Sequence, residues 1–164
     1  MIEPSQERPK LFLTFAGGDL ERVRPVAARL RAAGDGLAID YAIPSESFAA
    51  QRSELIRASL LLRLRRCAAA VCLVGADTAA DDWVRWTLNA AREQGLPLFG
   101  APLAEAPSPE SLELLADLGA TLVPLRGEAI VRHLRGAVEE TPAPRRAVER
   151  PLALALRLML HPLS

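Results

Sequence analysis

Apolar residues along the chain follow two spacings that alternate with each other. Five short apolar runs have the length and composition of buried strands; they occupy 11–15, 37–43, 68–75, 95–100 and 120–125. After each run, apolar residues recur every three or four positions, the spacing of one helical face, over about 20–34, 47–66, 83–94, 108–118 and 127–140. Five strand-then-helix units predict a five-stranded parallel sheet with right-handed crossovers, an α/β fold of the flavodoxin-like class with helices on both faces. Pro124 predicts that the last strand lies at an edge or ends there.

The run at 68–75 is the predicted centre of this fold. It is apolar throughout and ends in Gly, which is typical of a parallel strand covered on both faces. Asp81 or Asp82 then supplies the N-cap of the following helix, where a negative charge suits the positive helix end. Trp83 and Trp86 fall on one face of that helix, either anchoring it on the sheet or lining a cleft. The loop between strand and helix lies where open α/β sheets bind their ligands.

Composition excludes some classes of protein. Half of the 164 residues are hydrophobic, and 20 basic residues balance 20 acidic ones, which argues against a general nucleic-acid or membrane-surface binder. Cys67 and Cys72 have neither a redox nor a zinc spacing, so Cys72 is expected as a buried, reduced residue. His133 and His161 are far apart, and no metal site is expected. The polar start at 1–9 does not resemble a signal peptide, so we expect a cytoplasmic protein.

The chain divides into four parts. A loose N-terminus at 1–9 precedes the α/β domain at 10–140, a Pro-rich linker occupies 141–151, and an apolar C-terminal segment follows at 152–164. Leucine stands at every second position of 152–160. This stretch is too short to span a bilayer, which needs about 20 apolar residues. We expect it to be an interaction element that folds back on its own domain or docks on a second copy or a partner protein.

Two phosphate-binding arrangements of α/β proteins are only partly matched by this sequence. A phospho-receiver domain needs an Asp at the end of the third strand and a Lys after the fifth, but this chain has Gly75 and Arg126 there. The Gly17-Gly18 turn can bring backbone amides close to a phosphate at a helix N-terminus. It lacks the rest of a GxGxxG or P-loop motif, so a tight strand-to-helix turn is the favoured interpretation.

The order of these elements resembles that of TIR and TIR-like domains, among them the TIR subunit of Thoeris anti-phage defence systems. Such domains open with a strand and a turn ending in Asp, as in Phe12–Asp19. A Pro-bearing loop follows the second strand, as in Ile43–Glu46. A helix that starts with Trp follows the central strand, as in Asp82–Thr87, and a Gly and another strand come after it, as in Glu93–Leu98. The resemblance covers about 10–140 and implies a TIR-like fold.

The resemblance also implies a catalytic position, and the chain departs from it. In enzymatic members, the Glu four residues after the Trp is the catalytic acid of NAD cleavage, where it stabilises positive charge that develops at the ribose. Thr87 stands there instead, and its hydroxyl carries no charge near neutral pH. Glu46 is a candidate substitute. Glu93 is another, but it lies on a different helix face from Thr87.

The resemblance places a nucleotide site around the loops after the first two strands and the start of the Trp helix. The candidate nucleotide-binding residues are Phe15, Ala16, Gly17, Gly18, Asp19, Pro44, Ser45, Trp83, Arg85 and Trp86. Arg85 can pair with a phosphate or lie on a solvated helix face. The arginines of the second helix, Arg52, Arg57, Arg63 and Arg66, are expected on a solvated face. No cofactor is required, and NAD is a candidate substrate or ligand.

Two functions follow from different interpretations of Thr87. In the first, the chain is a TIR-like signalling or defence module that acts through protein–protein assembly and cleaves no NAD. In the second, it is an NAD-cleaving enzyme with an altered site that produces a nucleotide signal. The missing carboxylate favours the first.

Overall fold

A computed structural model describes residues 9–32, 37–42, 53–103 and 107–140. Its strands are β1 (Lys10–Thr14), β2 (Ala38–Tyr41), β3 (Ala69–Val74), β4 (Leu98–Pro102) and β5 (Thr121–Leu122). Its helices are α1 (Leu20–Ala32), α2 (Ser53–Arg65), α3 (Asp82–Glu93), α4 (Pro109–Asp117) and α5 (Gly127–Glu140), with short 3-10 turns η2 (Gly17–Asp19) and η4 (Thr78–Ala80).

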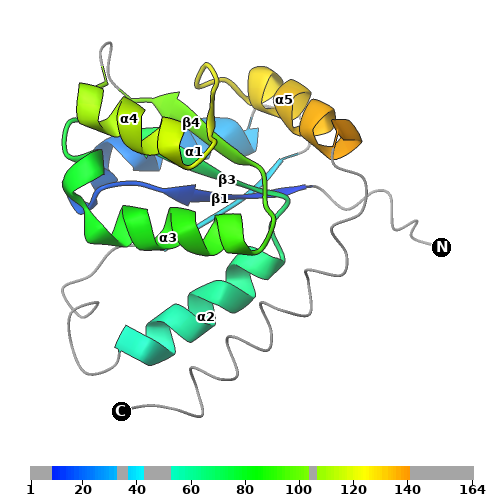
Figure 1. Cartoon of the computed structure of the whole chain (residues 1–164). Coiled ribbons are helices and arrows are strands. Elements are labelled where there is room, and N and C mark those ends of the chain that lie inside the picture. The colour runs from blue at the N-terminus through cyan, green and yellow to red at the C-terminus, as the bar shows by residue number, and fades with distance from the viewer. Residues whose placement is uncertain (1–8, 33–36, 43–52, 104–106, 141–164) are drawn as a thin grey trace.

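The five strands form one parallel sheet in the order β2-β1-β3-β4-β5. Helices cover both of its faces: α1 and α5 pack against one core, and α2, α3 and the Leu115 side chain of α4 pack against the other. Figure 1 shows α3 and α2 below the sheet and α5 above it. The predicted five-stranded parallel α/β fold is confirmed.

Strand β3 is the centre of the sheet, as its apolar sequence predicts. All six of its residues are buried. Because side chains alternate along a strand, Val71 and Leu73 point into the core under α1 and α5, while Cys72 and Val74 point into the core under α2 and α3. Burial raises the pKa of the Cys72 thiol to about 12, which fits the predicted buried, reduced cysteine.

Two strand boundaries, the start of β4 and the end of β5, differ from the prediction by three residues. β4 begins at Leu98 rather than at Gly95, because Gly95 adopts a φ of 77° and ends the helical turn before the strand can start. β5 is a short edge strand. Val123 still donates from its amide to the Gly100 carbonyl at 2.8 Å, but Pro124 has no amide with which to continue the ladder. The predicted edge position is confirmed.

The solvated arginine face expected on α2 is wrong for two residues. Arg63 forms an ion pair with Asp40 and donates to the Tyr41 carbonyl at 3.0 Å, so it ties the helix to the edge strand β2. The guanidinium of Arg57 lies 5.8 Å from the centre of the Trp86 ring. The sequence pattern could not show this because both partners are distant along the chain.

Parts of the prediction lie outside the described residues. These are the N-terminus at 1–8, the start of the second helix at 47–52, the linker at 141–151 and the C-terminal segment at 152–164. Within the described ranges, no helix is long and apolar enough to cross a membrane.

We predict that Leu73→Ala lowers the free energy of unfolding by about 2–5 kcal/mol, because it leaves a cavity in the fully buried central strand. Leu122→Ala is the matched control, since Leu122 is 50% exposed and its truncation should cost less than about 1 kcal/mol. Denaturant titration measures both. Equal losses in the two variants would contradict the central position of β3.

Candidate functional site

The candidate site lies where the chain changes direction in the sheet. From β1 the chain passes through α1 to β2, which lies on one side of β1 in the sheet. From β3 it passes through α3 to β4, which lies on the opposite side of β3. The loops that follow β1 and β3 therefore diverge from two adjacent strands. Open α/β sheets bind ligands in the crevice that such a switch in direction produces.

One carboxylate joins the two loops at this point. Asp81 is the N-cap of α3, and its Oδ1 accepts from the Val84 amide at 3.1 Å. Its Oδ2 accepts from the Gly17 amide at 3.2 Å, across 64 positions of sequence. The predicted cap at Asp81 is confirmed, and the amide of Gly17 is engaged by the protein itself.

The Gly17-Gly18 segment forms the tight turn that the sequence favours. It is the 3-10 turn η2, in which the Asp19 amide donates to the Ala16 carbonyl at 2.9 Å. Phe15, just before the turn, is fully buried and packs edge-on against Tyr41 with ring centres 5.7 Å apart. Phe15 is thus a core residue that positions the turn.

Asp19 lies over the end of β3. A Cβ atom added at Gly75 would stand 2.2 Å from Asp19 Oδ2, so a residue larger than glycine requires the carboxylate to move. That oxygen is buried and has no hydrogen-bond partner within the described ranges. Burial raises the pKa of Asp19, Arg22 opposes the shift, and the negative charges of Asp77 and Asp81 add to it.

The loop after β3 is held by its own hydrogen bonds. The Gly75 amide donates to Thr78 Oγ1 at 2.8 Å, and Arg85 Nε donates to the Ala79 carbonyl at 2.7 Å. Arg85 also lines a small pocket of about 270 Å³, which includes Ser108 and Glu110 from the start of α4. Arg85 therefore borders the α4 side of this loop.

The two tryptophans of α3 lie close together on the inner side of the helix. Trp83 is 5% exposed and belongs to the core under α2 and α3, whereas Trp86 is half-buried against that core. Their ring centres are 6.2 Å apart. Burial of Trp83 fits the interpretation that it anchors the helix on the sheet. A role of either ring in nucleotide binding stays a prediction.

Thr87, which the resemblance to TIR domains aligns with a catalytic Glu, faces the protein interior. It is 0% exposed, and its Oγ1 has no hydrogen-bond partner in the described part of the chain. Glu93 is exposed at the end of α3, so it lies on another face of the helix, as expected. The other predicted residues, Pro44, Ser45 and Glu46, lie outside the described residues.

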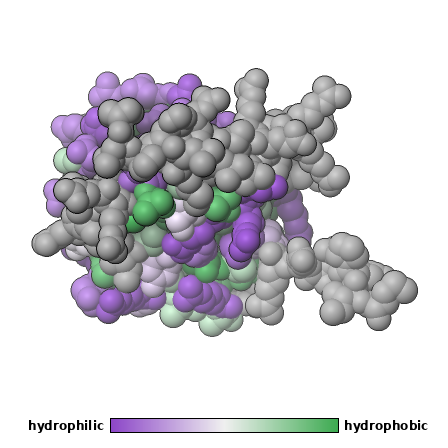
Figure 2. Space-filling view, turned by 90° about the horizontal axis from the view of Figure 1, so that it is seen from below, coloured by the Kyte–Doolittle hydropathy of each residue, from purple (hydrophilic) through white to green (hydrophobic). Residues whose placement is uncertain are grey.

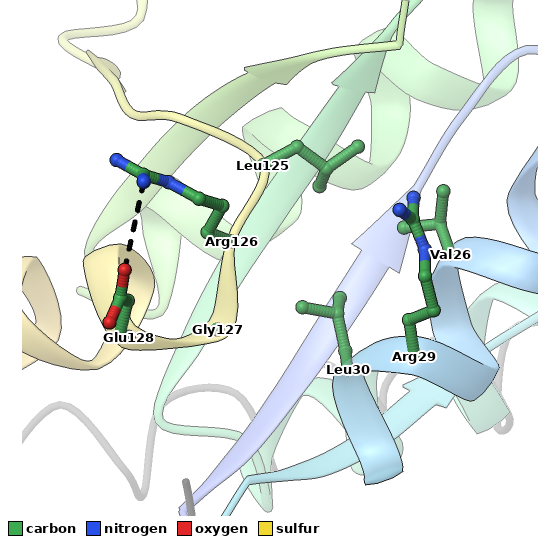
Figure 3. Close-up of a pocket in the computed structure, with 7 residues that line it drawn as sticks. All are labelled: Val26, Arg29, Leu30, Leu125, Arg126, Gly127 and Glu128. Carbon is green, nitrogen blue, oxygen red and sulfur yellow. Dashed lines mark ion pairs between the residues drawn. The ribbon is translucent and has the colours of Figure 1, made fainter. Parts of the chain in front are cut away.

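A second pocket, of about 340 Å³, lies between α1 and the start of α5. Its lining combines apolar side chains with two arginines and comprises Val26, Arg29, Leu30, Leu125, Arg126, Gly127 and Glu128. Figure 3 shows Arg126 turned toward Glu128, to which it is paired at 3.7 Å. None of the predicted nucleotide-binding residues lines this pocket.

The structure thus brings Gly17, Asp19 and the start of α3 together. It adds Asp77 and Asp81, which were not predicted as site residues. Asp81 was predicted only as a helix cap, since nothing in the local sequence marks its bond to Gly17. No group of metal-ligating side chains occurs among the residues that the structure describes.

The parallel sheet, the capped tryptophan helix and the turn after β1 define a TIR-like α/β domain. Comparison with protein families gives the particular group: residues 12–107, more than half of the chain, match the model of the Thoeris protein ThsB, TIR-like domain. The chain belongs to this family.

Comparison with solved structures finds a crystal structure from Burkholderia thailandensis E264 of a protein described as a pilus assembly protein (cpaE). It is 14% identical, has a TM-score of 0.48, and the match covers 80% of this chain and 98% of that one. No curated protein matches the chain.

We predict that Asp19→Asn stabilises the protein at pH 7 relative to the wild type. An acid whose pKa is raised on folding binds more protons in the native state than in the unfolded state. Its contribution to stability therefore falls as the pH rises from the ordinary pKa of 3.8 through the raised pKa of the folded protein. The melting temperature of the variant should exceed that of the wild type at pH 7, and the gap should close near pH 3.8. Asp82→Asn, at an exposed helix start, should show no such gain. A gap that is independent of pH would contradict the raised pKa.

A second prediction concerns Thr87. Thr87→Val keeps the side-chain shape and removes an unpaired buried hydroxyl, so it should be neutral or stabilise by about 1 kcal/mol. Thr87→Glu places a carboxyl in the same buried position and should destabilise by roughly 2–7 kcal/mol. Chemical denaturation of both variants measures the difference. If Thr87→Glu is as stable as the wild type, position 87 is accessible to solvent and the described packing of α3 is wrong.

Proposed function

We propose that the chain is a TIR-like signalling or defence module that acts through protein–protein assembly and does not cleave NAD. One observation carries the proposal: the position of the family's catalytic Glu holds Thr87, which is uncharged and fully buried. A buried hydroxyl can neither reach a bound ribose nor stabilise a positive charge that develops there. The family's name links such domains to Thoeris, so anti-phage defence in the cytoplasm is the proposed setting.

The chemistry of the switch point supports the same proposal. A dinucleotide brings phosphates, which bind best to free backbone amides and positive charge at a helix N-terminus. Here the Gly17 amide and the first turn of α3 are both bonded to Asp81. Asp19 and Asp77 add acidic groups near it, and like charges repel an incoming phosphate.

NAD cleavage by an altered site is the second candidate function. Asp19 is the observation that favours it, because a carboxyl with a raised pKa beside a crevice is a property of acid–base catalysts. Glu46, which the sequence suggests as a replacement acid, would act from the loop after β2.

We predict that the purified full chain, incubated with NAD, releases little or no nicotinamide. Chromatography of free nicotinamide measures this, with a catalytically active TIR enzyme as positive control. Turnover on the order of 1 per second or more would overturn the non-catalytic proposal.

If turnover is observed, Glu46→Gln and Asp19→Asn identify its acid. Loss of activity in one variant with unchanged folding assigns the role to that carboxyl. Full activity in both variants would exclude both residues as the replacement.

A further inference from the structure

The edges of the sheet are the parts of it that its helices do not cover. Helices pack on both faces. Figure 2 views the molecule from the side on which α2 lies in Figure 1, and there apolar side chains are interspersed with polar ones. Among the described residues, β2 pairs with β1 alone and stands at one end of the sheet order. Because an edge strand presents backbone groups to which a strand of another molecule can bond, the β2 edge is a place where two copies can pair.

Two residues of β2 direct their backbone groups away from the sheet. The Ala38 amide donates to the Pro9 carbonyl at 2.9 Å, so the backbone of Ala38 faces β1. Since the backbone groups of successive strand residues point to alternate sides, Asp40 also faces β1, whereas Ile39 and Tyr41 face outward. A strand that joined this edge would therefore bond to the outward carbonyls of Ile39 and Tyr41.

Arginine side chains already occupy both outward carbonyls. Arg31 of α1 donates from Nη2 to the Ile39 carbonyl at 3.2 Å. Arg63 of α2 donates from Nη2 to the Tyr41 carbonyl at 3.0 Å. Because α1 and α2 pack on opposite faces of the sheet, the two guanidinium groups reach the edge from both sides. We call Arg31 and Arg63 the edge arginines.

Further contacts hold each guanidinium group in this position. Arg63 Nε donates to Asp40 Oδ2 at 3.1 Å, and its guanidinium lies 5.7 Å from the centre of the buried Phe12 ring. The Arg31 guanidinium lies 5.9 Å from the centre of the Tyr41 ring. A planar guanidinium can stack on a ring while its N–H groups donate to an acceptor. The edge arginines are therefore fixed by several contacts each, and their positive charges repel the same charges on a second copy.

We propose that the edge arginines prevent two copies of this chain from joining their β2 strands into one continuous sheet. The joined arrangement would be symmetric, because a two-fold axis places the same strand of each copy against the other. It needs the two outward carbonyls that the edge arginines occupy. This block holds whether or not the chain cleaves NAD, and it restricts assembly of the chain to surfaces other than the β2 edge.

Removal of both edge arginines tests the proposal. The triple variant Arg31→Met, Arg63→Met and Asp40→Asn keeps the apolar stems, frees both carbonyls and leaves no unpaired carboxylate at the edge. It should form dimers at a protein concentration at least about tenfold lower than the wild type does, because two acceptors become free. Sedimentation velocity measures this. A folded triple variant that associates no more than the wild type would overturn the proposal.

A matched control carries the same change of charge away from the edge. Arg24→Met on α1, Arg65→Met on α2 and Asp82→Asn on α3 together also remove two positive charges and one negative charge, all at exposed positions. This control should associate as the wild type does. Equal association of the control and the triple variant would show that net charge, rather than the free carbonyls, causes dimerisation, and would contradict the proposal.

Hydrogen exchange measured by NMR locates the contact. In dimers of the triple variant, the outward amides of Ile39 and Tyr41 should exchange at least about tenfold more slowly than in its monomers, because they donate to the second copy. The Ala38 amide, which is already bonded to Pro9, should change little. Dimers in which the protected amides lie on other elements would overturn the assignment to the β2 edge.

The single variant Arg31→Met tests the block even if the triple variant does not fold. It keeps the ion pair of Arg63 with Asp40, and Arg31 itself is exposed, so circular dichroism should show wild-type folding. It frees only the Ile39 carbonyl and should lower the concentration needed for dimers about two- to fivefold. A folded Arg31→Met chain that associates as the wild type does would overturn the proposal.

Discussion

The burial of β3 on both faces is the constraint on which the rest of this structure depends. A strand that is apolar at every position needs a helical layer on each side. The chain meets this need by sending α1 and α5 to one face and α2 and α3 to the other. Because α1 and α3 cover opposite faces, the chain leaves β1 in one direction and β3 in the other. A crevice therefore forms between the ends of these two strands. The candidate site is therefore a consequence of how the core is covered.

Asp81 determines the chemical character of that crevice. Its two carboxylate oxygens bind the Val84 amide and the Gly17 amide, so one side chain both starts α3 and holds the neighbouring turn. In nucleotide-binding α/β proteins, amides at this place receive a phosphate. When a carboxylate of the protein already occupies them, the crevice is stabilised without a ligand. Asp19, placed over Gly75, adds a second acidic group rather than a basic one.

Much of this fold could be predicted from sequence because its signals are local. The apolar run of β3 and the Asp81 cap each act within a few residues, and both are confirmed. Contacts between distant segments could not be predicted in this way. The bond of Arg63 to Asp40 and that of Gly17 to Asp81 join positions far apart in sequence, which a periodic pattern does not relate. The acidic character of the site depends on such a contact, so it emerged only from the structure.

The buried position of Thr87 supports the proposed lack of NAD cleavage through packing as well as through charge. The buried residues of α3 include Trp83, Val84, Thr87, Leu88 and Ala91, which together form a continuous inward stripe. Thr87 lies in the middle of that stripe, where a carboxylate would lose its hydration and find apolar neighbours. A Glu introduced there cannot face a ligand unless α3 rotates, and rotation would withdraw Trp83 from the core. The packing of the helix on the sheet therefore opposes a solvent-facing carboxylate at position 87, which is consistent with the proposed function.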